Sequence, residues 1–178
     1  MTSTLTLHAA PGAGFDEPFE MLAACHQRVA RMLDLLARLA GHLPAKGCDD
    51  EARQAARDVM RYFDLAGPAH HEDEERHVFP ALEALPDPAM RALVARLRED
   101  HLALSAQWRG VRADLAAIEA GAWRADEAAA TRWATFAALY RQHIAAEEGQ
   151  AYPMAHPLLD GPAQAAMGQE MARRRGAR

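Results

Sequence analysis

The sequence of 178 residues has little cysteine and no long apolar run. Its two cysteines, Cys25 and Cys48, exclude a disulfide framework. A helix running from one toward the other would hold them beyond bridging distance, so both are expected to be free thiols. A membrane helix needs roughly 18 consecutive apolar residues, and no segment comes close. The N-terminal residues lack the basic and apolar segments of a secretory signal. We therefore expect a cytoplasmic protein with no membrane partner.

Residues that favour strands are also scarce. The sequence has 5 Val and 2 Ile against 42 Ala, a composition that favours helices over strands. Hydrophobic residues make up 50% and charged residues 25%, which excludes a disordered chain. The length suits one domain with a single core. The sequence therefore predicts one all-α domain.

The charge balance excludes one class of partner. The formal net charge is -5, whereas nucleic-acid binding depends mostly on cationic residues that neutralise phosphates. The one dense basic patch, Arg173 to Arg175, stands near the C-terminus and is expected to be a solvated tail. No nucleic-acid partner is expected.

Apolar residues recur at steps of three and four over four segments, which is the period of an amphipathic helix. The first predicted helix covers 18–43. The second begins at the capping residues Asp49 and Asp50. It is expected to kink or break at Gly67 and Pro68.

The later helices are bounded by similar signals. Pro80 and Pro86 are expected in the connection after the second helix. The third helix begins after Asp87 and ends at Gly121, and the fourth ends at Gly149. Four such helices with short connections predict an up-down-up-down four-helix bundle.

The chain is expected to divide into three parts. An irregular leader covers 1–17, the bundle covers 18–153, and a C-terminal extension covers 154–178. The extension is expected to add a short extra helix near 162–173.

Each predicted helix carries one histidine on its buried stripe. These are His26, His70, His101 and His143. The second and fourth helices add a glutamate four residues after the histidine, Glu74 and Glu147. Residues i and i+4 lie on one face of a helix, so each pair presents an imidazole and a carboxylate to the same point. At about 1.5 Å of rise per residue the four histidines stand at similar depths, so all six side chains are expected to meet in one layer.

Burying these six groups without a cation would leave desolvated charge, at a cost of several kcal/mol. A metal removes that cost. Six imidazole and carboxylate donors are too many for one tetrahedral zinc site, and two irons fit better. The histidines of the first two helices would bind one ion and those of the last two the other, with both glutamates shared. Manganese or a mixed pair of metals is left open.

Two stretches then carry a resemblance to a known family. The run from His70 to Pro80, HHEDEERHVFP, resembles the H-x-x-x-E-E-x-x-L-F-P motif of the hemerythrin-like family, also called the HHE cation-binding domain. The run from His143 to Pro153, HIAAEEGQAYP, resembles its second copy. With the histidines of the first and third helices, the match covers about 18–153. The resemblance implies a four-helix bundle with a non-haem di-iron centre and the same six ligands; the bridge between the irons, oxo or hydroxo, is left open.

The sequence departs from the oxygen-carrying members of that family, which carry a second histidine one turn away on the third helix. Leu97 and Ser105 occupy the flanking positions here, so the chain resembles the four-histidine branch. His77 is the best substitute for the missing imidazole. Whether it, His71 or Glu72 completes the site is left open.

Other candidate residues are expected to have structural roles. His71 and Glu75 leave the buried stripe by about 100°, which favours support of the ligands over metal binding. Tyr140 and Trp108 are expected to be core aromatics, and Cys25 a small core residue. The remaining histidines are expected at the surface: His8, His42 and His156.

The four-histidine branch includes relatives in iron and oxygen sensing, NO response and iron–sulfur repair. We expect a non-haem di-iron protein that binds O₂, NO or iron as a sensor, carrier or store. The alternative is a di-iron redox enzyme acting on peroxide or NO. A third hypothesis, in which the histidines are only packed, predicts a metal-free chain as stable as the purified one. The expected partner is a small ligand such as O₂, NO or peroxide; a redox or signalling partner is left open.

Overall fold

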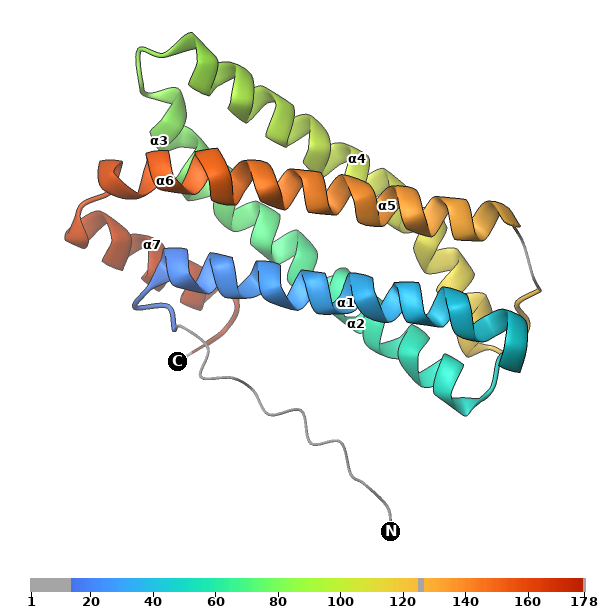
Figure 1. Cartoon of the computed structure of the whole chain (residues 1–178). Coiled ribbons are helices and arrows are strands. Elements are labelled where there is room, and N and C mark those ends of the chain that lie inside the picture. Colours follow the sequence, from blue (N-terminus) through green and yellow to red (C-terminus); the bar gives the residue numbers. More distant parts are fainter. Residues whose placement is uncertain (1–13, 125–126, 178) are drawn as a thin grey trace.

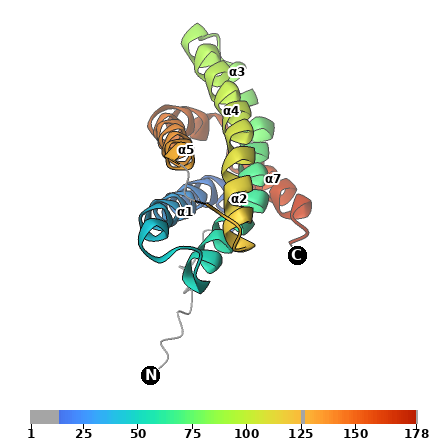
Figure 2. The ribbon, with the colours of Figure 1, turned by 90° about the vertical axis from the view of Figure 1, so that its right-hand side faces the viewer.

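The computed structural model describes residues 14–124 and 127–177, and these residues form helices and no strand. The longest helices are α1 (Pro18–Lys46), α2 (Asp50–Asp73), α4 (Pro88–Glu119) and α5 (Glu127–Ala146). α1 packs against α2, α2 against α4 and α4 against α5, and α5 closes the ring against α1 (Figure 1, Figure 2). Successive members of the ring run in opposite directions (Figure 1). The predicted all-α, up-down-up-down bundle is confirmed.

Capping residues set the starts of two of these helices. Asp49 accepts a hydrogen bond from the backbone N–H of Ala52 at the start of α2. Asp87 does the same for Ala89 at the start of α4. Each cap satisfies a backbone donor that has no partner within the helix. Gly121, just after α4, has a φ of 69°, a conformation that suits glycine. The predicted starts of the second and third helices and the end of the third are therefore confirmed to within about two residues.

Two helices of the ring continue into further helical segments by way of π-turns. The segments after α2 are a π-turn (Glu74–Val78) and α3 (Phe79–Glu83). The segments after α5 are a π-turn (Glu147–Ala151), α6 (Tyr152–Ala155) and a 3₁₀ turn (His156–Leu158). The two π-turns occupy equivalent positions in the two motif copies.

The predicted connection at Pro80 and the predicted helix end at Gly149 are wrong, because the helical path continues through both residues. In the first π-turn the N–H of Phe79 bonds to the carbonyl of Glu74, five residues back, and the second π-turn repeats this pattern. A proline in an α-helix lacks an N–H and clashes with the carbonyl four residues earlier. The wider turn just ahead of each proline accommodates it, and the helix runs on.

The broken turn predicted at Gly67 and Pro68 is also wrong, because α2 continues through both residues, and the kink predicted as its alternative stays a prediction. Pro68 removes one backbone hydrogen bond, but buried side chains on either side, Phe63 and His70, hold the neighbouring turns. Gly67 allows close packing, since a Cβ there would lie 3.3 Å from the hydroxyl oxygen of Tyr140. Tertiary packing therefore outweighs the local signal.

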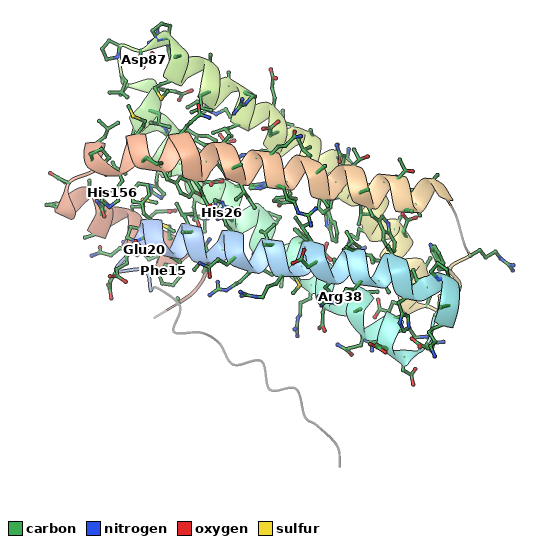
Figure 3. The ribbon with its side chains drawn as sticks, viewed as in Figure 1. Phe15, Glu20, His26, Arg38, Asp87 and His156 are labelled. Atoms are coloured by element: carbon green, nitrogen blue, oxygen red, sulfur yellow. The ribbon has the colours of Figure 1, made fainter. Side chains whose placement is uncertain are left out.

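The core consists of two apolar clusters separated by a polar layer. One cluster joins the end of α1, the start of α2, the end of α4 and the start of α5, and includes Leu33 and Phe136. The other joins the starts of α1 and α4 and the end of α5 with the two π-turns, α3, α6 and the C-terminal helix, and includes Leu22 and Phe79. In Figure 3, His26 lies on the side of α1 that faces the other helices. The buried polar residues that form this layer are His26, His70, Glu74, His101, His143 and Glu147.

The C-terminal helix α7 (Gly161–Arg174) lies beside the start of α1 (Figure 1). The short extra helix predicted near 162–173 is therefore confirmed. Arg174 and Arg175 both pair with the fully buried carboxylate of Asp73, and one Nη atom of Arg175 lies 2.9 Å from it. The prediction of a solvated basic tail is wrong for these two arginines, because a buried carboxylate needs cationic partners.

The ends of the chain are described only in part. Of the predicted leader over 1–17, residues 1–13 lie outside the described residues. The limits of the bundle, 18–153, and of the extension, 154–178, stay predictions of how the chain divides. Within the described ranges, the helices are too short or too polar to cross a lipid bilayer.

A substitution at Gly168 tests how α7 docks. A Cβ there would lie 1.7 Å from the backbone carbonyl oxygen of Phe15. Gly168→Ala forces backbone to move, so we expect the free energy of unfolding to fall by about 1–3 kcal/mol. The measurement is urea unfolding followed by circular dichroism.

The matched control is Gly41→Ala in α1, where nothing lies within 4 Å of an added Cβ. Alanine's higher helix propensity is expected to raise stability there by about 0.5–1 kcal/mol. Equal effects of the two substitutions would contradict the docking of α7 on Phe15.

Candidate metal centre

Six side chains gather in the polar layer, and each has a relative exposure of 6% or less. They are the six residues predicted from spacing: His26, His70, Glu74, His101, His143 and Glu147. The histidines come from the four long helices, and each glutamate is the first residue of a π-turn. π-turns inside helices are frequent at functional sites. The structure therefore brings all six side chains to one depth.

One set of four donors lies between α1 and α2. Nε2 of His26 is 3.0 Å from Nε2 of His70 and 3.1 Å from Oε2 of Glu147. Nε2 of His70 is 3.3 Å from Oε1 of Glu74. Ligands that bind one ion at right angles, through bonds of about 2.1 Å, stand about 3 Å apart. The separations in this set suit a single cation.

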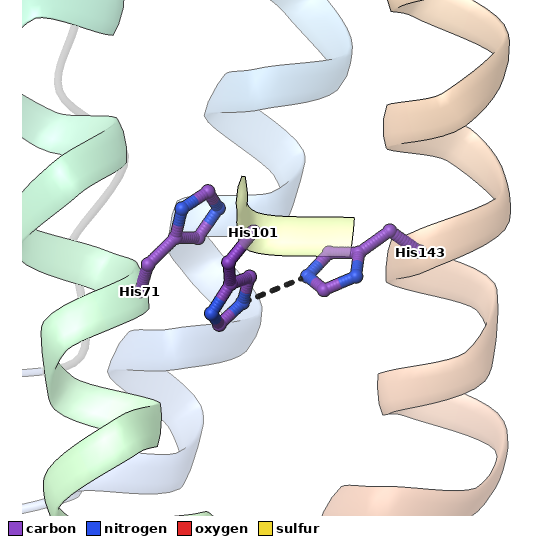
Figure 4. A group of neighbouring side chains, drawn as sticks. All are labelled: His71, His101 and His143. Carbon is purple, nitrogen blue, oxygen red and sulfur yellow. Dashed lines mark hydrogen bonds between the residues drawn. The ribbon is translucent and has the colours of Figure 1, made fainter. Parts of the chain in front are cut away.

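A second set lies between α4 and α5. Nε2 of His101 is 3.1 Å from Nε2 of His143 (dashed line in Figure 4) and 3.3 Å from Oε2 of Glu74. Nε2 of His143 is 2.9 Å from Oε1 of Glu147. Each glutamate therefore turns one oxygen to each set, the arrangement expected of a carboxylate that bridges two ions.

Three carboxylate oxygens of the layer have no hydrogen-bond partner in the described part of the chain: Oε2 of Glu74 and both oxygens of Glu147. An imidazole nitrogen lies within 3.3 Å of each, but without the geometry of a hydrogen bond. A buried carboxylate oxygen without a partner is destabilising by several kcal/mol. A cation between the donors removes this cost, so the donor set fits a bound metal.

The charges of the layer also favour a bound cation. Burial and the charge of Glu74 oppose ionisation of Glu147, but the surrounding imidazoles outweigh them and lower its pKa to about 2. Burial opposes protonation of His101, yet the two glutamates raise its pKa to about 9. Burial also disfavours the charged forms of Glu74 and His70. The attraction between these two side chains outweighs it, so the pKa of Glu74 is lowered and the pKa of His70 is raised. The ionised carboxylates therefore draw positive charge into the core, as protons or as metal.

Carboxylates outside the layer orient two of the histidines. Nδ1 of His26 is 3.0 Å from Oε1 of Glu148, and Nδ1 of His101 is 3.0 Å from Oε1 of Glu75. Histidines that bind metals usually donate their other N–H to a carboxylate or carbonyl, which fixes the ring. The position of Glu75 agrees with the supporting role expected for it. Glu148 has the same relation to the other set.

The other two histidines differ from this pattern. Nδ1 of His143 lies 3.4 Å from Oδ2 of Asp100, which is long for a hydrogen bond. Nδ1 of His70 is buried without a hydrogen-bond partner among residues 14–124 and 127–177. The buried free thiol of Cys25 lies on α1, one residue before His26.

Comparison with known proteins agrees with this geometry. Residues 17–155 match the family model of the hemerythrin HHE cation-binding domain. The chain belongs to the hemerythrin HHE cation-binding family. An uncharacterized protein of Haemophilus influenzae is 30% identical over 164 residues, which cover 92% of each chain. The HHE domain identifies this chain as a hemerythrin-like metal-binding protein.

Two candidates for an additional ligand in the HHE domain lie away from the layer. Nε2 of His77 is 2.8 Å from Oε2 of Glu170 in α7, so this imidazole helps to dock the C-terminal helix. Glu72 is half exposed and pairs with Arg76. The structure therefore brings neither to the donor sets.

The histidines expected at the surface are placed as follows. His42 is half-buried and pairs with Asp49 at 2.9 Å. His156 is exposed, beside the ring of Phe19. His8 lies outside the described residues.

His71 lies against the second donor set. Its ring stacks on that of His101, with centroids 4.0 Å and planes 11° apart (Figure 4). One nitrogen each of His71, His101 and His143 lie within 4.8 Å of one another, but an imidazole binds metal in its ring plane, so the parallel rings of His71 and His101 point their lone pairs past one another. Burial and the charge of His101 lower the pKa of His71 well below its usual range, which keeps the ring neutral. In this orientation His71 supports the set by packing.

Tyr152 is a functional candidate that the spacing argument missed. Its hydroxyl donates a hydrogen bond to Oε1 of Glu74 and lies 3.2 Å from Nε2 of His26. Burial and the nearby glutamates raise the pKa of Tyr152 well above its usual range, which favours the protonated phenol. The sequence feature that could have indicated this residue is a difference between the two motif copies: Tyr152 occupies the position that Phe79 has in the first copy.

A small pocket of about 30 Å³ opens beside His71. Aromatic and aliphatic side chains form most of its wall, including Phe63, Leu104 and the two predicted core aromatics, Trp108 and Tyr140. A volume of this size holds a molecule no larger than a few atoms. The pocket therefore reaches the second donor set only through His71, whose ring stacks on His101.

Truncation of the outer glutamates tests their orienting role. Glu75→Ala and Glu148→Ala are each expected to weaken metal binding about 10- to 100-fold, because one histidine of the layer loses the partner that fixes its ring. The measurement is competition for the metal with a chromophoric chelator.

The matched control is Glu72→Ala, which removes a carboxylate from the same stretch of helix without touching the layer. We expect its metal affinity to stay within a factor of about two of the unchanged chain, as for a surface substitution. A loss as large as that of Glu75→Ala would show that general charge, not ring orientation, sets the affinity.

Proposed function

We propose that this chain is a non-haem di-iron protein that binds O₂, NO or iron itself, as a sensor, carrier or store. The proposed ligands are His26 and His70 for one iron, His101 and His143 for the other, and Glu74 and Glu147 for both. The observation that carries the proposal is that each glutamate turns one oxygen to each histidine pair.

Donor chemistry favours iron over structural zinc. Four imidazole nitrogens and four carboxylate oxygens face the centre, which exceeds the four donors of a tetrahedral structural site. Divided between two ions, they give each ion four protein donors. Imidazole and carboxylate together suit iron. When bound, the iron pair supplies open coordination positions for a small ligand.

The chain's own residues control what reaches those positions. The apolar clusters on both sides of the layer exclude bulk water. Glu75 and Glu148 fix two histidines from outside. The pocket beside His71 is small and mostly apolar, which supports an uncharged ligand of a few atoms, such as O₂ or NO, over a larger or charged one.

Metal content tests the proposal directly. Protein purified from iron-replete cells is expected to hold about two iron atoms per chain, one for each donor set. His70→Ala and Glu74→Ala each remove a proposed ligand and are expected to lose most of the bound iron. His71→Ala, on the same helix, is expected to keep nearly all of it, because the stacked ring binds no metal. Iron is measured by mass spectrometry and protein by amino-acid analysis of the same sample.

A colourless, metal-free preparation that cannot be reconstituted would overturn the proposal. Loss of iron in His71→Ala as large as that in His70→Ala would show that the ligands lie on another face of α2. Spectra after anaerobic reduction, recorded under O₂, NO and peroxide, then divide the roles. A reversible adduct supports a carrier or sensor, and steady turnover with a reductant supports the alternative redox enzyme.

A further inference from the structure

The two motif copies differ in the aromatic residue that precedes the proline. Phe79 in the first copy stacks on His101, with ring centroids 5.4 Å apart and planes at 24°. Tyr152 in the second copy stacks on His26, at 5.3 Å and 7°. Both rings are buried and pack in the same way. The hydroxyl of Tyr152 is therefore not needed for packing, since Phe79 does without it.

The hydroxyl oxygen of Tyr152 lies among the donors of the first set. It is 3.2 Å from Nε2 of His26 and hydrogen-bonded to Oε1 of Glu74. These two atoms are proposed ligands of the same ion. Separations of about 3 Å are those of neighbouring ligands around one ion. The phenol oxygen thus has the position of one more ligand, close to two of the others.

A tyrosine ring that stacks on a metal-binding histidine can still place its phenol oxygen on the same ion. A second imidazole in the same stacked position cannot. The lone pair of an imidazole nitrogen lies in the ring plane, whereas a phenol oxygen binds an ion at a bent angle that need not lie in its ring plane. The nearly parallel rings of Tyr152 and His26 can therefore serve one ion. The parallel rings of His71 and His101 cannot.

We propose that the phenol oxygen of Tyr152 is a further ligand of the ion held by His26 and His70. This inference rests on the proposed function. Metal binding releases the phenol proton to solvent, as it does for other protonated ligands. The first ion then has five protein donors and the second has four. The second ion would then have more open positions for a small ligand than the first.

The chain has three tyrosines, which makes a spectroscopic assignment direct. The experiment compares ferric-iron-loaded protein grown with ordinary and with ring-deuterated tyrosine, by visible absorption and resonance Raman spectroscopy. We expect a visible charge-transfer band and tyrosinate ring modes that shift with the label, and loss of both in Tyr152→Phe. The control Tyr140→Phe removes a hydroxyl that lies 3.4 Å from Nε2 of His71, outside the proposed ligands, and is expected to keep both signals.

Iron content measured on the same samples separates this inference from the proposed function. A wild-type chain that binds about two irons but shows no label-sensitive tyrosinate modes would overturn the role of Tyr152 and leave the di-iron proposal in place. Signals that survive in Tyr152→Phe and vanish in Tyr140→Phe would also overturn it. A wild-type chain that binds no iron would overturn the proposed function itself. Where Tyr152→Phe does not fold, retention of both signals in Tyr140→Phe and in Tyr62→Phe assigns them to Tyr152, the third tyrosine, and their loss in either variant would overturn the inference.

Discussion

Burial of ionised carboxylates in the middle of the bundle is the constraint on which the other features depend. Glu74 and Glu147 are shielded from solvent, and the imidazoles around them keep their pKa values low. Packing alone cannot stabilise such a layer, because buried charge needs opposite charge close by. Each long helix is therefore held at one height. A shift by a single turn, about 5.4 Å, would carry its histidine into an apolar cluster and leave the carboxylates without partners.

One sequence pattern builds the layer twice. In each copy the first of two adjacent glutamates faces the histidines of both sets, and the second reaches the histidine of another helix. Glu75 thus orients His101, and Glu148 orients His26. Adjacent residues on a helix point in different directions, so the two glutamates of each copy can reach different partners. The π-turn that begins at the first glutamate adds a residue to the turn, and the helix then continues beyond the proline.

The six donors were predictable because the period of a helix converts spacing along the chain into direction and depth. The features that the sequence did not predict depend on contacts between helices that are far apart in the chain or on local backbone geometry. Pro80 signals the end of an ordinary helix, and only the preceding π-turn lets the helix pass it. Arg174 reads as part of a tail until the fold brings it to Asp73, 101 residues away. His71 lies off the predicted stripe of its helix and Tyr152 lies beyond the predicted end of the fourth helix, and the places of both are set by rings on other helices.

Differences between the two copies bear on function more than the features they share. The shared donors supply two equivalent positions. The first has the hydroxyl of Tyr152, where the second has only the ring of Phe79. The second has His71 and the pocket, where the corresponding residue of the other motif is Ile144. Storage of iron does not require the two ion positions to differ in their surroundings, since both ions would then serve the same purpose. A carrier or sensor would benefit from such a difference, because under the two proposals one ion would be held by more protein donors than the other. Within the proposed function, the asymmetry therefore favours binding of a small ligand over storage.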